Sequence, residues 1–357
     1  MKTYNNIYDE IVSLPNLFLA WEEFRIGKKN KKDVLEFEWH LEENIVKLYR
    51  DLRYHRYKHD VYTSFYITDP KRRKIHKATV RDRILHHAVF RIVNPVFEPT
   101  FIASSFSCRI GKGNHRGVYF LEKLIRSESR NFTKPAYILK CDVRKFFDSI
   151  NHKILLSVIS KKIKDEVLTG LFKEIIGSFD SESICAGTQI ERERERERER
   201  EISCRRQESL FSLKGIPIGN LTSQLFANIY MNEFDQFVKH ELKVKKYVRY
   251  TDDFVIVSSS LKYLNDLLPK IQTFLNNELK LELHPSKISI RKAKQGVDFL
   301  GYVILPWHIL LRTRTKKRMI RRVNSVNLSS YMGLLRHCKG KAIEKKITML
   351  ANLPKGE

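Results

Sequence analysis

The stretch KYVRYTDDFVIVSSS, residues 246–260, decides the fold of this chain, because two adjacent carboxylates stand between two short apolar runs. Runs of β-branched and aromatic residues predict buried strands, and Asp252 and Asp253 fall at the turn between them. A second apolar run, AYILKC at 136–141, ends on Asp142, which precedes Asp252 by 110 residues. Carboxylates on adjacent strands could hold two magnesium ions, which prefer hard oxygen ligands and keep several waters. On its own, an Asp-Asp pair is more often a simple turn or a solvated pair.

The segments around these two runs set the order of the elements. GIPIGN at 215–220 breaks the chain ahead of a helix expected over 222–239, where apolar residues recur at helical spacing. A second helix is expected from residue 261, followed by short strands in LELHPSKISI and VDFLGYVIL. The expected order is a strand, helices, a strand pair, a helix and further strands. This order predicts an α+β sheet of the split βαβ kind, with helices on one face.

The charge balance points to a polyanionic partner. The 357 residues include 67 Lys and Arg against 41 Asp and Glu, a net charge of +26, and 42% of them are hydrophobic, which fits a folded protein with two or three subdomains. A field of this sign favours nucleic acid, although a basic protein with no particular ligand, or one that binds anionic membrane, would show the same charge. KRRKIHKATVRDR at 71–83 suits a strand pair that faces phosphates, and a solvated basic face is the alternative.

Other features narrow the class of protein. Five cysteines, at 108, 141, 185, 204 and 338, show no Cys-x-x-Cys spacing, so neither a disulfide framework nor a structural zinc site is expected. The first residues lack the pattern of a signal peptide and no apolar run reaches membrane-spanning length, so a cytoplasmic protein with no membrane partner is predicted. The repeat ERERERERERE at 191–201 has six Glu and five Arg, and its near-zero net charge favours a solvated surface insertion over an RNA-contacting arm.

Five blocks of the chain resemble, in order and spacing, those of bacterial reverse transcriptases: KCDVRKFFDSI, GIPIGNLTSQLFANIY, RYTDDFVIV, LELHPSK and FLGYVI. Upstream, RDRILHHAVFRIVNPVFEPTF and SCRIGKGNHRG resemble the blocks of the fingers region, so the resemblance covers roughly residues 60 to 335. It implies a right-hand polymerase of the α+β class, with fingers, palm and a short thumb, and a ferredoxin-like palm sheet. It also implies RNA-directed DNA synthesis with two Mg²⁺ ions, which Mn²⁺ can replace, on an RNA template and a DNA or RNA primer, with dNTPs as substrates.

Roles for single residues follow from the resemblance, position by position. Asp142 and Asp252 would bind both metal ions, Asp253 and the carbonyl of Val143 would complete the site, and Lys287 would protonate the pyrophosphate. Phe147 stands at the steric gate that rejects a ribose 2′-hydroxyl, although a core phenylalanine is the plain alternative. The other nucleotide-binding candidates are Arg109, the weaker candidates Arg83 and Lys74, and Ile218 and Gln224. Basic residues of a thumb helix would follow the template–primer backbone, unless they form a merely solvated face: Arg312, Arg314, Lys316, Lys317, Arg318, Arg321 and Arg322.

The positions of the blocks predict the domain boundaries. The predicted parts are an N-terminal helical extension over 1–60, fingers over 61–135, a palm over 136–305 and a short thumb over 306–357. A fingers insertion over about 152–212, which contains the 191–201 repeat, would interrupt the palm. In the extension, the four-three-four spacing of Leu41, Ile45, Leu48 and Leu52 predicts an amphipathic helix within residues 32–53.

The helix-entering block reads IGNLTSQ where group II intron and retroviral relatives usually show Pro-Gln-Gly, and it most resembles reverse transcriptases of bacterial diversity-generating retroelements. In those systems a template RNA is copied with errors at adenines, and a basic accessory protein assists. Ile218 in place of glutamine removes hydrogen-bonding groups beside the nascent pair, so reduced fidelity is expected. The alternatives are an antiphage-defence or group II intron-like reverse transcriptase, an RNA-templated RNA polymerase, a template-independent DNA synthase, and a catalytically silent RNA-binding or maturase-like protein.

Overall fold

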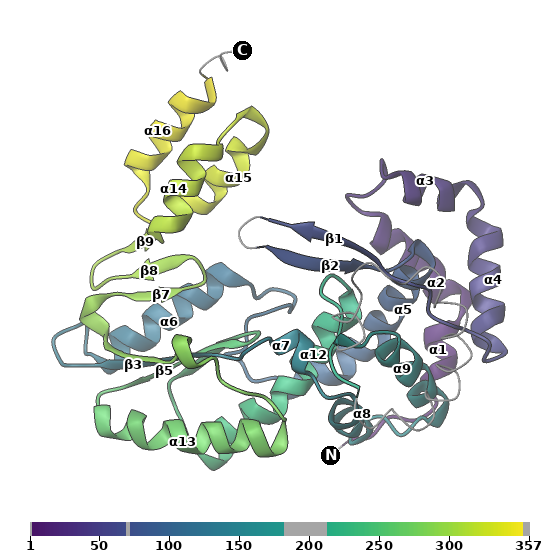
Figure 1. Ribbon diagram of the computed structural model, residues 1–357, viewed down its shortest axis with the longest axis horizontal. Coiled ribbons are helices and arrows are strands. Elements are labelled where there is room, and N and C mark those ends of the chain that lie inside the picture. The colour runs from purple at the N-terminus through teal and green to yellow at the C-terminus, as the bar shows by residue number, and fades with distance from the viewer. Residues whose placement is uncertain (1, 69–71, 182–212, 353–357) are drawn as a thin grey trace, which may run out of the picture. The chain divides into compact units, whose positions relative to one another are not determined.

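The computed structural model describes residues 2–68, 72–181 and 213–352, and the chain divides into two compact units (Figure 1). Each unit is assembled from three separate stretches of sequence. The first unit comprises Met1–Ile102, Val143–Phe237 and Thr273–Glu282, and the second comprises Ala103–Asp142, Val238–Gln272 and Leu283–Glu357. The 191–201 repeat, Cys185 and Cys204 lie outside the described residues, as does the second half of the expected insertion.

The first unit is mainly helical and is organised around two buried helices. The first, α5 (Val80–Phe97), begins where the hydroxyl of Thr79 accepts a hydrogen bond from the backbone N–H of Asp82, and it packs against α2 (Leu14–Arg25). The second, α12 (Leu221–Gln236), packs against α5 and is buried on nearly every side, as expected of a helix in the centre of a core. Shorter helices of this unit include α1 (Tyr8–Val12), α7 (Phe146–Ser149), α8 (His152–Ser160) and α9 (Glu166–Gly177), with a 3₁₀ turn at Glu98–Thr100. The π-helical turn at Phe237–Glu241 has only its first residue in this unit.

Two sequence expectations for the first unit can be compared directly with the structure. A strand pair forms, but only part of 71–83 belongs to it: β2 (Arg73–Lys77) pairs antiparallel with β1 (Thr63–Ile67), Thr63 opposite Lys77, and from Val80 the segment is helical. The amphipathic helix within 32–53 is α4 (Leu41–Arg53), whose apolar stripe is buried, but α3 (Lys32–Trp39) forms a separate helix before it. The two helices separate at His40, whose φ of −121° and ψ of 43° are not helical.

The centre of the second unit is a four-stranded antiparallel sheet with the order β4-β5-β3-β6. The first and third of its strands in chain order lie in the middle, with helical connections after the first and third. That is the ferredoxin-like, split βαβ arrangement, so the predicted α+β class and palm-sheet topology are confirmed. The strands are β3 (Tyr137–Asp142), β4 (Tyr247–Tyr250), β5 (Asp253–Ser258) and β6 (Ser289–Lys292). Helix α6 (Asn114–Glu128) packs on one face of this sheet, and α13 (Leu261–Glu278) begins on the other side (Figure 1). The expectation of helices on one face only is therefore wrong, because α6 precedes the first strand in the chain and lies on the opposite face from α13.

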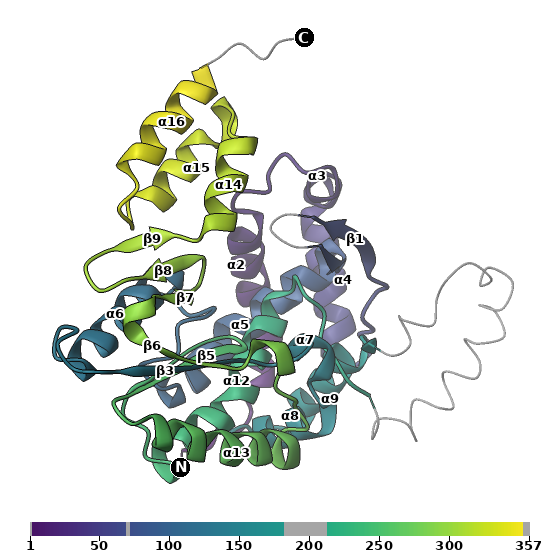
Figure 2. The same cartoon turned by 60° about the vertical axis from the view of Figure 1, so that its left-hand side comes forward.

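A smaller antiparallel sheet and three helices follow in the second unit (Figure 2). Strands β7 (Val297–Phe299), β8 (Tyr302–Ile304) and β9 (Ile309–Leu311) lead into α14 (Thr313–Arg322), α15 (Ser325–Leu335) and α16 (Lys341–Asn352). One apolar cluster runs from the central sheet through Phe299 and Tyr302 to Met319 in α14 and Ile347 in α16, so the C-terminal helices share the core of this unit. No helix in the described part of the chain is long and apolar enough to cross a membrane.

Candidate active site

Strand pairing in the second unit brings the three predicted carboxylates together. Asp142, the last residue of β3, lies directly opposite Asp253, the first residue of β5. Asp252 lies in the two-residue turn that joins β4 to β5, because Tyr250 and Asp253 are paired across that hairpin. The hydrogen-bonded ladder of the sheet thus places Asp142 beside Asp252 and Asp253, although 110 residues separate Asp142 from Asp252 in the sequence.

The hairpin turn holds a residue in a conformation that its side chain disfavours. Thr251 has a φ of 56°, in the left-handed region that β-branched residues rarely adopt. Its hydroxyl is 2.5 Å from the hydroxyl of Ser107, and its carbonyl accepts a hydrogen bond of 3.0 Å from Nη1 of Arg249. These contacts hold the strained turn in place, and strained backbone of this kind is common where geometry serves function.

Arg249 is a supporting residue that the sequence analysis did not identify. Its side chain is fully buried, and Nη2 donates to the hydroxyl of Ser105 at 3.1 Å. The backbone of Arg249 also bonds to the 104–106 segment on both sides, from its N–H to Ser104 and from its carbonyl to Phe106, each at 3.0 Å. The signal was available, because an arginine in the otherwise apolar strand YVRY has to find partners inside the core.

Two of the three carboxylates, Asp252 and Asp253, have raised pKa values. Burial, together with Asp142 and Asp253, raises the pKa of Asp252 to about 6. Burial also raises the pKa of Asp253, and the ammonium of Lys140 partly opposes that increase. The neighbouring thiol of Cys141 has its pKa raised to about 12 by burial and by both adjacent carboxylates. A group of acids that resists ionisation in this way favours binding of a cation.

Two lysines already contact these carboxylates. The ammonium of Lys287 lies 2.6 Å from Oδ1 of Asp142. Lys287 is the last residue of a 3₁₀ turn (Pro285–Lys287). The backbone N–H of His284, just before this turn, donates to the carbonyl of Asp142 at 2.8 Å. The ammonium of Lys140 lies 3.4 Å from Oδ2 of Asp253. Lys287 was predicted from the sequence, whereas Lys140 was not.

The donor set suits magnesium if substrate supplies the remaining ligands. Oδ1 of Asp253 is buried and has no hydrogen-bond partner among the described residues, so it is available to a ligand. Within residues 2–68, 72–181 and 213–352, no three His, Cys, Asp or Glu side chains converge closely enough to hold a metal ion unaided. Magnesium in phosphoryl-transfer sites is commonly bound by one or two carboxylates together with water and substrate phosphates, and the residues fit that pattern.

Arg109 lies in the same unit, in the loop that supports the hairpin. Its Nη1 donates to the carbonyl of Ser105 at 3.0 Å, so one of its guanidinium donors fixes the segment that also contacts Arg249. The predicted contact of Arg109 with a triphosphate remains a prediction.

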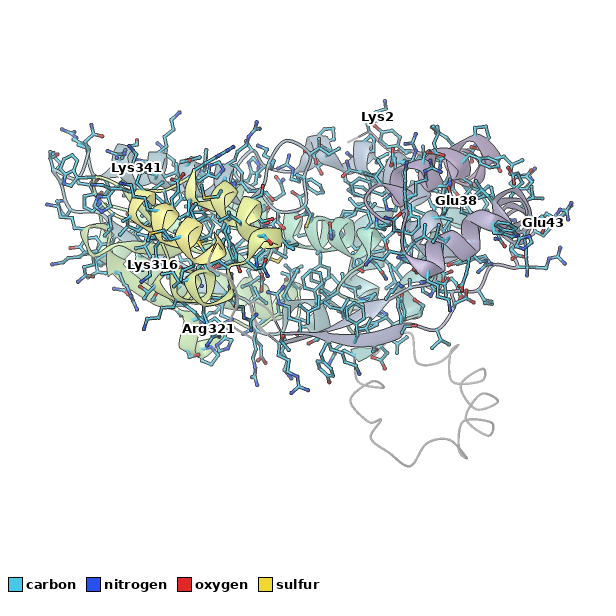
Figure 3. The ribbon with its side chains drawn as sticks, turned by 90° about the horizontal axis from the view of Figure 1, so that it is seen from above. Lys2, Glu38, Glu43, Lys316, Arg321 and Lys341 are labelled. Carbon is cyan, nitrogen blue, oxygen red and sulfur yellow. The ribbon has the colours of Figure 1, made fainter. Side chains whose placement is uncertain are left out.

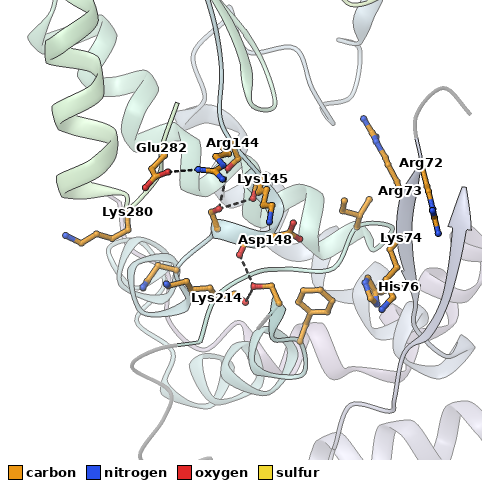
Figure 4. Close-up of a pocket in the computed structure, with 15 residues that line it drawn as sticks. Arg72, Arg73, Lys74, His76, Arg144, Lys145, Asp148, Lys214, Lys280 and Glu282 are labelled. Atoms are coloured by element: carbon orange, nitrogen blue, oxygen red, sulfur yellow. Dashed lines mark hydrogen bonds and ion pairs between the residues drawn. The ribbon is translucent and has the colours of Figure 1, made fainter. Parts of the chain in front are cut away.

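Other nucleotide-binding candidates lie in the first unit, where a cavity of about 1100 Å³ opens beside β2 and α7 (Figure 4). Lys74 and Ile218, two of the predicted nucleotide contacts, line it, and their contact with a nucleotide remains a prediction. Basic side chains face it from both sides, with Arg72, Arg73 and Lys74 across from Lys145, Lys214 and Lys280, and Arg144 completes the set. Asp148 and Glu282 are the acidic residues of the lining, and Glu282 is paired with Arg144 at 3.6 Å.

The remaining candidates of the first unit have defined surroundings. Arg83 donates to Asp33 at 2.5 Å and stacks over the ring of Phe24. Phe147 is half-buried in α7, where its ring meets that of Phe146 edge-on. Gln224 is half-buried in the first turn of α12.

The predicted thumb helix is α14, which presents its basic residues to solvent around one buried residue, Met319. Figure 3 shows Lys316 and Arg321 on this helix. Arg312, just before it, is bound to the carboxylate of Asp298, with its Nε at 2.8 Å. The others are wholly or partly exposed: Arg314, Lys316, Lys317, Arg318, Arg321 and Arg322.

Comparison with known proteins agrees with this arrangement. Residues 61–304 match the family model described as "Reverse transcriptase (RNA-dependent DNA polymerase)". Protein YkfC of Escherichia coli (strain K12) is 23% identical over 281 residues, covering 69% of this chain and 65% of that protein. The group II intron-encoded protein LtrA of Lactococcus lactis subsp. cremoris is 24% identical over 328 residues, covering 74% of this chain and 50% of that protein. The chain thus spans between half and two thirds of the length of these relatives.

Among solved structures, the chain is similar to two telomerases. Telomerase from Candida albicans, in complex with a fragment of telomeric RNA, matches with a TM-score of 0.46 and 13% identity over 88% of this chain and 59% of that one. Apo telomerase from Candida tropicalis matches with a TM-score of 0.47 and 12% identity over 76% of this chain and 52% of that one. Because the family model covers more than half of the sequence, the chain belongs to the reverse transcriptase (RNA-dependent DNA polymerase) family.

Proposed function

We propose that this chain is an RNA-directed DNA polymerase that adds dNTPs to the 3′ end of a DNA or RNA primer on an RNA template. The observation that carries the proposal is the strand register that sets Asp142 opposite Asp253, with Asp252 in the adjoining turn. Membership of the reverse transcriptase family supports the proposal, as do the raised pKa values of Asp252 and Asp253.

The proposed mechanism is phosphoryl transfer assisted by two divalent ions, Mg²⁺ or Mn²⁺. Asp142 and Asp252 would bind both ions, and Asp253 and the carbonyl of Val143 would complete their coordination. When bound, such ions activate the primer 3′-hydroxyl and neutralise the charge that develops on the phosphates. The Nζ atom of Lys287 lies 2.6 Å from Oδ1 of Asp142, and the resemblance makes this lysine our candidate for protonating the pyrophosphate that leaves.

The incoming nucleotide is assigned to the basic cavity of the first unit. Its seven cationic side chains against two carboxylates suit a triphosphate, which carries several negative charges. Lys74 is the better supported phosphate contact of the two weaker candidates, because Arg83 already binds Asp33. Phe147 is proposed as the steric gate, and Gln224 and Arg109 as further nucleotide contacts. A basic α14 would follow the template–primer backbone.

The subtype we propose is a retroelement enzyme that copies its template RNA with errors, assisted by a basic accessory protein. Ile218, which lines the cavity, supports this assignment because a side chain without hydrogen-bonding groups discriminates weakly between paired bases. Ile218→Gln should lower misincorporation at template adenines by several fold, as counted by sequencing the cDNA. Equal error rates at all four template bases in the unchanged protein would favour the defence or intron-like alternatives.

The decisive test is incorporation of labelled dNTPs on an RNA template annealed to a DNA primer, in the presence of magnesium. Asp252→Asn should reduce incorporation by about a thousandfold, since it removes a carboxylate from the reacting centre. Asp266→Asn, an exposed change on α13, is the matched control and should leave the rate unchanged. Phe147→Ala should in parallel let rNTPs compete with dNTPs.

Three outcomes would redirect the proposal. Preference for rNTPs in the unchanged protein would indicate an RNA polymerase, and incorporation without any template would indicate a template-independent synthase. Stable, salt-sensitive RNA binding with no incorporation, in the presence of Mn²⁺ as well, would leave the silent RNA-binding protein as the better assignment.

A further inference from the structure

The hairpin of β4 and β5, with Asp252 and Asp253 at its turn, is called the carboxylate hairpin. Lys140 connects this hairpin to the neighbouring sheet of the second unit. Its ammonium lies 3.4 Å from Oδ2 of Asp253 and donates to the backbone carbonyl of Asp298, in β7, at 2.9 Å. The same ammonium lies 6.0 Å from the ring centroid of Phe299, the next residue of β7. One side chain thus joins β5, which carries a carboxylate, to the sheet β7-β8-β9.

The position of Lys140 in β3 explains how it reaches that site. Side chains alternate between the two faces of a strand, so Lys140 shares a face with Asp142, two residues later. Asp142 is opposite Asp253 in the ladder, and Lys140 is opposite Val255, two residues further along β5. The ammonium therefore approaches the carboxylates along the face of the sheet on which the reaction would occur.

The contact between Lys140 and Asp253 is partly shielded from solvent. The side chains of Lys140 and Asp253 are 22% and 20% exposed, so water screens their attraction less than it screens an exposed pair. The second donor bond, to a backbone carbonyl, fixes the ammonium independently of the carboxylate. Oδ2 of Asp253 is held by this lysine, which leaves Oδ1 as the oxygen with no partner among the described residues.

The charges of the carboxylates and of their two lysines affect how strongly the cluster binds a cation. Asp142, Asp252 and Asp253 would carry three negative charges, and Lys140 and Lys287 contribute two positive charges in direct contact. Two lysines therefore stabilise the cluster before a cation arrives. A positive charge so close to the cluster must also oppose cation binding, because like charges repel strongly where water is excluded.

We propose that Lys140 is a positioning residue of the polymerase site. Its ammonium holds the carboxylate of Asp253 in one orientation, and its positive charge weakens cation binding at the carboxylates. The inference rests on the proposed function for its kinetic part, whereas its binding part does not require polymerisation. Removing the ammonium should tighten cation binding and slow the reaction, two effects of opposite sign. A lysine that only stabilised the fold would not produce that combination.

The test compares Lys140→Met with Lys246→Met and Lys140→Arg. Lys246 is a closely matched control, because its pair with Glu128, at 2.6 Å, has side-chain exposures of 23% and 19% and lies in the same unit away from the carboxylates. Mn²⁺ binding to the protein without nucleic acid, followed by electron paramagnetic resonance, should be about three- to tenfold tighter in Lys140→Met than in the other two. Asp252→Asn identifies the fraction of Mn²⁺ that binds at the carboxylates.

The kinetic arm uses the incorporation assay at saturating Mg²⁺. For Lys140→Met, kcat should fall about tenfold with little change in the KM for dNTP, because the defect lies in alignment and not in nucleotide binding. Lys140→Arg should retain most of the rate, since it keeps a charge and two donors at the same place. Thermal unfolding in EDTA separates a folding defect from both effects.

Equal Mn²⁺ affinity in Lys140→Met and Lys246→Met would overturn the inference, and so would weaker binding in Lys140→Met. If the unchanged protein does not polymerise but Mn²⁺ binds more tightly to Lys140→Met, the proposed function fails while the position of Lys140 beside a cation site stands. If Lys140→Met does not fold, Lys140→Gln takes its place in the binding measurement, with the same expected direction.

Discussion

The carboxylate hairpin of the second unit and the basic cavity of the first unit carry opposite charge and are built in opposite ways. In the hairpin, Asp253 contacts Lys140, and the turn between β4 and β5 is fixed by the buried Arg249. Asp142, opposite Asp253 on β3, contacts Lys287 of the same unit. In the cavity, most cationic side chains are exposed, and Arg144 is paired with Glu282 of the lining.

This difference indicates how each region would meet its ligand. The hairpin is preorganised, so its geometry exists before any ion or substrate binds, as expected where charge must be stabilised in a transition state. The cavity has excess positive charge on flexible side chains, and a polyanion would order them as it binds. Changes in the hairpin should therefore act on stability and rate, whereas changes in the cavity should act on substrate affinity.

The largest effect is expected from Arg249→Met, which tests whether the hairpin depends on its buried support. The substitution leaves the carbonyl of Thr251 and the hydroxyl of Ser105 without their donor, and we expect the free energy of unfolding to fall by about 3 kcal/mol. Urea unfolding measures this change. Arg336→Met, at an exposed position of the same unit, should change the stability by less than about 0.5 kcal/mol. Equal losses in the two variants would mean that Arg249 is not a support.

The next effect concerns pH and sharpens the electrostatic side of the comparison. Because the folded-state pKa of Asp252 is raised to about 6 from 3.8, folding favours the protonated acid. Protonated Asp252 therefore stabilises the folded state below about pH 4, and this stabilisation is lost as pH rises through 6. The free energy of unfolding should fall by up to about 3 kcal/mol over this range. In EDTA, Asp252→Asn should therefore gain in Tm relative to the unchanged protein between pH 5 and pH 7. Parallel Tm curves for the two proteins over that range would contradict this electrostatic account.

A smaller effect is expected from charge reversal in the cavity. Lys74→Glu should raise the KM for dNTP by about tenfold and leave kcat within a factor of about two, because it repels the triphosphate before the reacting groups are aligned. Lys47→Glu, an exposed change on α4, controls for the general loss of positive charge. A decrease in kcat with unchanged KM would place Lys74 in the reacting centre and remove the distinction drawn above.

The smallest effect is expected for single residues of α14. Lys317→Ala should weaken binding of a template–primer duplex only modestly, and it should reduce the slope of log affinity against log salt by about 1. Fluorescence anisotropy at several salt concentrations measures this slope. An unchanged slope would indicate that the helix presents a solvated basic face.

The sequence predicted the hairpin better than its supports, for a physical reason. Local patterns predicted that Asp142, Asp252 and Asp253 lie at the ends of strands, and the register of the sheet brings these positions together. Their role was predicted from the resemblance and not from these patterns. Lys140 and Arg249 act through partners about 110 to 160 residues away, such as Asp253, Asp298 and Ser105. A charged residue inside an apolar strand signals that it has a partner but does not identify it. The break at His40 was also missed, since neither Pro nor Gly marks it.

The interleaving of the two units governs how the chain can fold. The first unit lacks its last stretch until residue 282 has been made, and the second unit includes residues beyond it, so neither is complete when only the N-terminal half has left the ribosome. Contacts between segments so distant in sequence form slowly, and chains of this size pass through intermediates that expose apolar surface. Synthesis speed and chaperone supply should therefore control the yield of active protein more strongly than they would for two consecutive domains.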